Sequence, residues 1–133
     1  MEMDALMKEA VKARTYAYVP YSKFAVGAAL LLEDGTMIRG ANIENASYGL
    51  ANCAERTVLF KAYSEGNRRI RAIAVVGDTP EPIAPCGACR QVMVELCEPA
   101  MPVYLSNLEG KWTKTSVQAL LPGYFKAEDM YDN

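Results

Sequence analysis

The chain has 133 residues, the length of one domain, so we expect a single domain over residues 1–133. Hydrophobic residues make up 51% of the sequence and charged residues 23%, a balance typical of a globular protein. The net charge of −2 and the isoelectric point of about 5.2 exclude the large basic face on which nucleic-acid binding depends, and they favour a small-molecule partner.

The N-terminal segment predicts an amphipathic helix. Apolar residues recur three and four positions apart, at Met3, Leu6, Ala10, Ala13 and Ala17. The helix is expected to end before Pro20, which disfavours helical geometry at the residue preceding it. Charged residues interrupt this segment, so it lacks the apolar centre of a signal peptide. We therefore expect a cytoplasmic protein with reduced thiols.

Two strands are predicted after the helix. Residues 24–32 form the longest apolar run, which is far too short to span a bilayer and indicates a buried strand, so we expect no membrane partner. The turn residues 33–35 and a second strand over residues 36–42 complete a hairpin.

The remainder alternates between helices and strands. Residues 43–52 are rich in Asn, Ser and Gly and indicate a loop, and three prolines mark a second loop over residues 78–85. Helices are predicted over residues 53–64, 86–98 and 116–121, and strands over residues 71–77, 102–105 and 111–115. This order predicts an α/β fold, a three-layer α/β/α sandwich around a mixed sheet of about five strands. Both long central helices follow a strand and a loop, which places their N-termini where ligands of open α/β sheets bind.

The sequence contains four cysteines and no histidine. The absence of histidine excludes Ser-His and Cys-His nucleophiles and every zinc site that requires an imidazole. Thiolates must therefore hold any transition metal, and a carboxylate is the expected agent of acid–base chemistry near neutral pH.

Three of the cysteines have the spacing of a catalytic zinc site. Cys86 and Cys89 are three positions apart in the first turn of a predicted helix, so their thiols face the same way, and Cys53 opens another helix. Three protein ligands and one vacant tetrahedral position distinguish a catalytic zinc site from a structural site with four ligands. A lone C-x-x-C pair would instead favour a redox pair or half of a structural zinc site. Cys97 follows Cys89 by eight positions on one predicted helix, roughly 12 Å along the axis, so we interpret it as a small buried apolar residue.

Glu55, two positions after Cys53, indicates which reaction the cysteines serve. A metal ligand, one spacer, Glu and a later Pro-Cys-x-x-Cys form the signature of zinc deaminases, here with cysteine ligands only. Zinc lowers the pKa of a bound water, so that hydroxide attacks C4 of cytosine while Glu55 carries protons to N3 and to the departing amine. Three thiolates leave the zinc cluster with a charge of −1, which the two helix N-termini and Arg56 could offset.

The sequence resembles the small, homotetrameric, all-cysteine family of cytidine deaminases over almost its whole length. The resemblance rests on residues 20–24, 26–30, 40–48, 53–56, 85–91 and 120–125. It implies hydrolytic deamination of cytidine and deoxycytidine to uridine and deoxyuridine with release of ammonia, as in pyrimidine salvage, and one zinc ion per subunit of a homotetramer.

The resemblance also implies roles for individual residues. Phe24 would stack on the pyrimidine, Asn42 and Glu44 would hold the ribose, and the backbone of Ala54 would meet the edge of the base. Arg56 would bind a cysteine sulfur. Tyr48 and Phe125 would reach the pocket of a neighbouring subunit, so the active site would be shared.

Several alternatives remain open from the sequence. One is a related deaminase of a modified cytosine nucleoside, of the blasticidin type, although Asn42 and Glu44 favour a plain nucleoside. A non-catalytic zinc-stabilised domain and a thiol redox protein are others, and a polynucleotide editor fits poorly with the acidic composition. No residue decides between cytidine and deoxycytidine.

Overall fold

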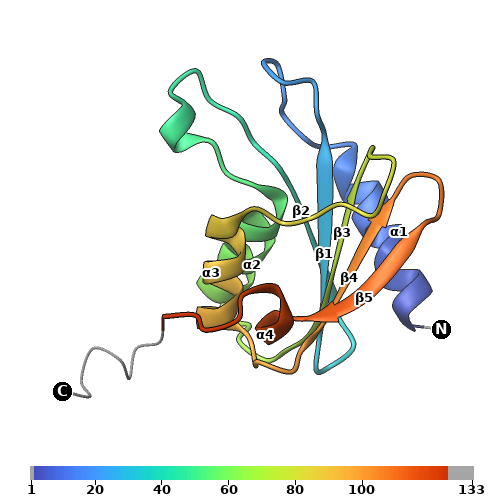
Figure 1. The fold of residues 1–133 in the computed structure, drawn as a ribbon, viewed down its shortest axis with the longest axis vertical. Coiled ribbons are helices and arrows are strands. Elements are labelled where there is room, and N and C mark those ends of the chain that lie inside the picture. The colour runs from blue at the N-terminus through green and yellow to red at the C-terminus, as the bar shows by residue number, and fades with distance from the viewer. Residues whose placement is uncertain (1, 126–133) are drawn as a thin grey trace.

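The computed structural model describes residues 2–125, whose helices and strands are shown in Figure 1. The helices are α1 (Glu2–Arg14), α2 (Ala54–Ser64), α3 (Gly87–Leu96), α4 (Val117–Leu120) and the short 3₁₀ helix η1 (Tyr48–Leu50). The strands are β1 (Val26–Leu32), β2 (Met37–Ala41), β3 (Ile70–Gly77), β4 (Pro102–Asn107) and β5 (Trp112–Ser116). None of the described helices combines the length and the apolar composition needed to cross a bilayer.

The strands form one mixed sheet in the order β2-β1-β3-β4-β5. β3 and β4 are parallel, and the other neighbouring pairs are antiparallel. The register places Val26 at the start of β1 opposite Gly77 at the end of β3, and Gly77 opposite Asn107 at the end of β4. Ala41, the last residue of β2, pairs with Gly27. One end of the sheet therefore gathers the loops that carry the candidate site residues.

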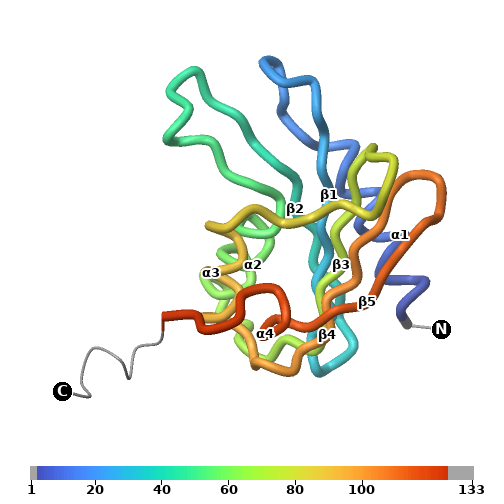
Figure 2. The backbone as a smooth tube through the Cα atoms, viewed as in Figure 1, coloured from blue at the N-terminus to red at the C-terminus, as the bar shows by residue number. Residues whose placement is uncertain are grey.

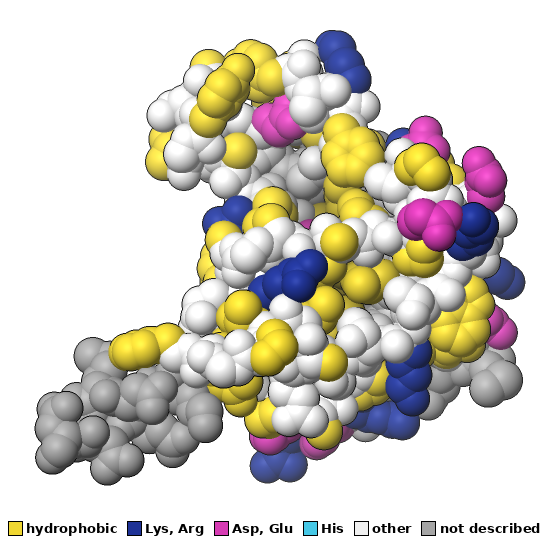
Figure 3. Space-filling model, in the orientation of Figure 1, with side chains coloured by type: hydrophobic (Ala, Val, Ile, Leu, Met, Phe, Trp, Pro, Cys, Tyr) yellow, Lys and Arg dark blue, Asp and Glu magenta, His cyan; other side chains and the backbone are white. Residues whose placement is uncertain are grey.

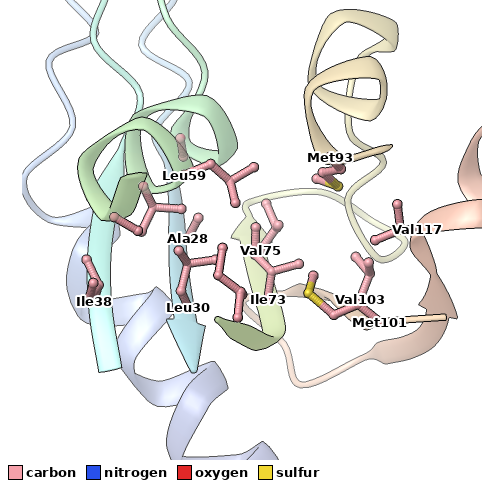
Figure 4. Close-up of a cluster of buried hydrophobic side chains, with 14 of the residues drawn as sticks. Ala28, Leu30, Ile38, Leu59, Ile73, Val75, Met93, Met101, Val103 and Val117 are labelled. Atoms are coloured by element: carbon pink, nitrogen blue, oxygen red, sulfur yellow. The ribbon is translucent and has the colours of Figure 1, made fainter. Parts of the chain in front are cut away.

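Helices cover both faces of the sheet. α1 packs on one face, where Leu6 and Ala10 contact Ala29 and Leu31 of β1 in one buried cluster. The second cluster, drawn in Figure 4, fills the space between the opposite face and α2, α3 and α4. The three-layer α/β/α sandwich with five strands is thus confirmed, and the double cover explains why every residue of β1 is buried.

Gly27 allows α1 to pack directly on the backbone of the sheet. A Cβ atom at this position would lie 2.0 Å from the carbonyl oxygen of Ala10 and 2.5 Å from the backbone nitrogen of Arg14. Both contacts are with helix backbone, which cannot move aside as a side chain can. The glycine within β1 therefore reflects a close approach of two elements, as glycine in a strand often does.

Tertiary contacts shift several boundaries from those that the sequence predicts. α1 ends at Arg14, before Ala17, because Tyr18 pairs with the chain near Asn42 and Ile43 instead of continuing the helix. β1 begins at Val26 instead of residue 24, because the Asn42 side chain forms hydrogen bonds with the Phe24 carbonyl and the Val26 amide in place of a neighbouring strand. The helix predicted over residues 86–98 ends at Leu96, and η1 lies within the predicted loop 43–52.

Candidate metal and catalytic site

Three cysteine thiols meet at the N-termini of α2 and α3. Cys53 is the residue before α2, Cys86 is the residue before α3, and Cys89 lies in the first turn of α3. The Sγ atom of Cys86 lies 3.7 Å from that of Cys53 and 3.4 Å from that of Cys89. All three sulfur atoms lie within 4.8 Å of one another. The predicted convergence of these thiols is therefore confirmed, across 33 positions of sequence between Cys53 and Cys86.

This donor set fits a zinc ion. Zn–S bonds of about 2.3 Å in a tetrahedral site place two sulfurs about 3.8 Å apart, close to the separations observed here. Cys89 is fully buried, Cys53 is partly buried and Cys86 is exposed, so the site is anchored in the core and open on one side. Three cysteines would hold the metal, and one tetrahedral position would be left for water or substrate.

Cys97 does not belong to this group. It caps the C-terminal end of α3, packs partly buried against the cluster shared by α2, α3 and α4, and is absent from the group of possible metal ligands found among residues 2–125. Burial raises the pKa of its thiol to about 12, which keeps it protonated at neutral pH. Its interpretation as a packing residue is consistent with these contacts.

Two helix N-termini and one arginine favour the ionised form of the thiols. Cys53 and Cys86 occupy the N-cap positions of their helices, where the helix dipole favours a negative charge. The Nη2 atom of Arg56 donates a hydrogen bond to the Cys53 sulfur at 3.4 Å. Interaction with the Cys89 thiol, and then with Arg56, lowers the pKa of Cys53 to about 5, while the same contact with Cys53 raises that of Cys89. One thiolate is thus favoured even before a metal adds its own charge.

Glu55 is a buried carboxyl group beside this cluster. It lies on the first turn of α2 with only 4% of its surface exposed. Burial raises its pKa to about 6, and the negative charge of Cys53 acts in the same direction. A carboxyl group with this pKa can both accept and release a proton near neutral pH, as a general acid–base catalyst must.

The Asn42 side chain shapes the loop that presents Phe24. The Asn42 Oδ1 atom accepts a hydrogen bond from the Val26 amide, and its Nδ2 atom donates to the Phe24 carbonyl, both at 2.9 Å. The Phe24 ring lies over Gly77, where a Cβ atom would come within 3.3 Å of it. Phe24 is therefore held at the end of β3, and 38% of its surface stays exposed.

Glu44 holds the turn before Phe24. Its Oε1 atom accepts hydrogen bonds from the Tyr21 and Ser22 amides at 3.1 Å, and its Oε2 atom accepts one from the Ser22 hydroxyl. The Ser22 hydroxyl is the main cause of a lowered pKa at Glu44. Ser22 also accepts from the Phe24 amide, and Lys23 between them adopts a positive φ of 61°. The role of Ser22 was not predicted from the sequence, because its contacts with Glu44 join positions 22 apart.

Ala54, Tyr48 and Phe125 have contrasting positions. Ala54 is fully buried at the start of α2, between Cys53 and Glu55. Tyr48 lies on η1 at the tip of a projecting loop, 78% exposed, with its ring 6.4 Å from that of Tyr21. The loops that carry these two tyrosines project from the same end of the sheet (Figure 2). Phe125 is 59% exposed at the end of the described chain, so neither Tyr48 nor Phe125 is buried against the cysteines of its own chain.

Comparison with known protein families identifies this arrangement. The sequence model of the cytidine and deoxycytidylate deaminase zinc-binding region matches residues 1–105. The chain belongs to this family. Zinc is accordingly the metal for the three thiols, and the chain is a zinc-dependent enzyme of the deaminase family.

Individual deaminases of the family resemble the chain over its whole length. It is 66% identical over 132 residues to the cytidine deaminase of Halalkalibacterium halodurans, covering 99% of this chain and 100% of that protein. Identity to the cytidine deaminase of Sporosarcina psychrophila is 58%, over 98% of this chain and 96% of that one. The fold is that of the crystal structure of cytidine deaminase from Burkholderia pseudomallei, with a TM-score of 0.92 and 56% identity over 94% of this chain and 100% of that chain.

Proposed function

We propose that this protein hydrolyses the 4-amino group of cytidine and deoxycytidine, giving uridine or deoxyuridine and ammonia. The observation that carries the proposal is the buried Glu55 beside three convergent thiols that fit one zinc ion. The close relatives named cytidine deaminase support the same substrate class. The net charge of −2 favours a free nucleoside over nucleic acid as the substrate. We also propose that the reaction takes place in the cytoplasm.

Cys53, Cys86 and Cys89 would hold the zinc ion, which supplies a Lewis acid and lowers the pKa of water. Glu55 accepts the proton that the attacking water loses and donates it to N3 of the base. The oxygen of this water becomes bonded to C4, and the C4–N4 bond breaks. Glu55, ionised again, takes the remaining proton from this oxygen and passes it to the departing nitrogen, which leaves as ammonia. The pKa of about 6 suits a group that must change protonation state more than once in each cycle.

The loops at the end of the sheet would hold the nucleoside. The exposed face of Phe24 would stack on the pyrimidine, and the backbone at Ala54 would meet the edge of the base. An ionised carboxylate has about four acceptor positions, and three at Glu44 are used by Tyr21 and Ser22. The remaining position on Glu44, and the second hydrogen on Asn42 Nδ2, are available for ribose hydroxyls.

The decisive measurement is ammonia release from cytidine, with zinc determined on the same purified sample. We expect ammonia and about one zinc ion per chain, the content of a three-ligand catalytic site. Zinc without ammonia would contradict the proposed substrate and point to a modified nucleoside, such as blasticidin, or to a structural zinc domain. Neither zinc nor ammonia would contradict the site itself and favour a thiol redox pair at Cys86 and Cys89.

We also propose that the enzyme is a homotetramer whose subunits complete one another's pockets. The face drawn in Figure 3 carries hydrophobic side chains on the projecting loops and is hollowed between them. Tyr48 and Leu50, both in η1 on one of these loops, expose 78% and 72% of their surfaces, which favours burial against another subunit. From this surface Tyr48, and from the C-terminal segment Phe125, would reach a neighbouring pocket.

Sedimentation of the purified protein tests this assembly. We expect a species of four times the chain mass of 14.6 kDa, and loss of turnover when dilution dissociates it. Replacing Tyr48 by Ala should weaken the tetramer, whereas replacing Tyr104, which packs near the N-terminal helix, should leave the assembly unchanged. A fully active monomer would overturn both the assembly and the roles of Tyr48 and Phe125.

A further inference from the structure

Cys86 is the zinc ligand with the least support from packing. Cys89 is fully buried in the core, and Cys53 receives a hydrogen bond from Arg56. Cys86 is exposed, and its sulfur contacts only the two other thiols and the Cys89 amide among the interactions found for it. The position of Cys86 must therefore come mainly from its backbone.

Arg90 holds the backbone on both sides of Cys86. Its backbone nitrogen donates to the Cys86 carbonyl at 3.0 Å, as the first hydrogen bond of α3. Its side-chain Nε atom donates to the carbonyl of Pro85 at 2.9 Å. Because the peptide group is planar, fixing the Pro85 carbonyl also fixes the amide and the Cα atom of Cys86.

The same guanidinium reaches the C-terminal segment. Its Nη1 atom donates to the Leu120 carbonyl at 2.8 Å, at the end of α4, where helix carbonyls lack partners within the helix. The neighbouring Gln91 donates from Nε2 to the Phe125 carbonyl at 3.3 Å. One planar, multidentate group thus joins the loop before Cys86, the zinc-binding helix and the segment that leads to Phe125.

We propose that Arg90 is a positioning residue for the zinc site: it orients Cys86 through the Pro85 peptide and ties the site to the C-terminal segment. This inference rests on the zinc site of the proposed function. Residues that orient metal ligands change metal affinity by roughly 10–100-fold when they are replaced. The hydrogen bonds of Arg90 go to the carbonyls of Pro85, Cys86 and Leu120 and not to a thiol, so it would act on the metal through the position of Cys86.

The test is the rate at which the zinc-loaded enzyme releases zinc into an excess of a coloured chelator. Arg90→Met keeps the apolar stem and removes the donors, and we expect zinc release roughly 10–100-fold faster. Arg90→Lys keeps the charge but lacks the planar fork, so it should restore only part of the slow release. Arg69→Met is the matched control, because Arg69 lies on the surface in a weak ion pair with Glu33 and should leave the rate unchanged.

A second control separates positioning from general loss of stability. Leu6→Ala removes a fully buried side chain on the opposite face of the sheet and should lower the unfolding temperature with little change in zinc release. Zinc release by Arg90→Met within twofold of the parent would overturn the proposal, as would release that merely tracks unfolding temperature across all four variants. A parent protein that binds no zinc would instead contradict the proposed function.

Discussion

Replacing Glu55 by Gln is expected to lower the turnover of cytidine by roughly 10²–10⁴-fold, the usual contribution of general acid–base catalysis, while zinc stays bound. Gln has nearly the shape of Glu and can donate a hydrogen bond, but it cannot carry a proton between water, N3 and the departing amine. The measurement is ammonia release, with zinc content determined on the same sample.

Stability provides an internal check on the Glu55→Gln variant. Because the folded-state pKa of Glu55 is raised above its ordinary value of 4.5 to about 6, the folded protein binds this proton more tightly than the unfolded chain. The ionised carboxylate therefore costs stability once the pH rises through this interval. Neutral Gln removes that cost, so the variant should unfold at an equal or higher temperature than the parent at pH 7 and above. A loss of turnover with unfolding would not count as support.

Glu65→Gln is the matched control for Glu55→Gln. Glu65 lies exposed at the other end of α2, so its replacement should leave turnover unchanged. Ordinary activity in Glu55→Gln would contradict the proposed mechanism and favour a structural role for the zinc site.

Replacing Cys86 by Ala is expected to abolish both zinc retention and turnover. The variant leaves two thiols, too few for the three-ligand site. Loss of the metal removes several kcal/mol of transition-state stabilisation, which corresponds to a decrease in turnover of at least about 10³-fold. Cys86 is the best of the three ligands for this test, because it is exposed and its removal leaves no cavity in the core. Zinc content after dialysis against a chelator, and ammonia release, are the measurements.

Cys97→Ala is the control for Cys86→Ala. Cys97 has the same chemistry but lies at the far end of α3, with its pKa raised to about 12 by burial. Its replacement should keep one zinc ion per chain and full turnover, with only a modest loss of stability from reduced packing. A Cys86→Ala variant that holds zinc as firmly as Cys97→Ala would contradict the ligand assignment.

The layers of the fold were predictable because they depend on local patterns. The continuous apolar run of β1 and of β3 indicates strands with both faces covered, and the structure covers both. Errors fall at the boundaries. The N-terminal helix stops before Ala17 because Tyr18 finds a partner strand segment near Asn42, a contact that no local pattern reports.

The features of the site likewise fall into those that local sequence predicts and those that only contacts between remote residues create. The spacing of Cys86 and Cys89 fixes their shared direction, since both lie in one helical turn. The link between Glu44 and the turn that carries Ser22 was not predictable, because its hydrogen bonds join Glu44 to residues 22 and 23 positions away. The same holds for Arg90 and Leu120, which are 30 positions apart.

By itself, the sequence determined that cysteines must hold any transition metal, because it has no histidine, and it named Glu55 as the acid–base group beside them. The type of each side chain and a spacing of three within a helix are local properties. They can be deduced from the sequence without knowledge of the fold. Only the tertiary structure decided that the Cys53 and Cys86 sulfurs lie 3.7 Å apart and that Glu55 is buried enough to raise its pKa. The packing of helices against the sheet determines how far apart remote residues lie and which side chains are removed from water. No short stretch of sequence predicts either property.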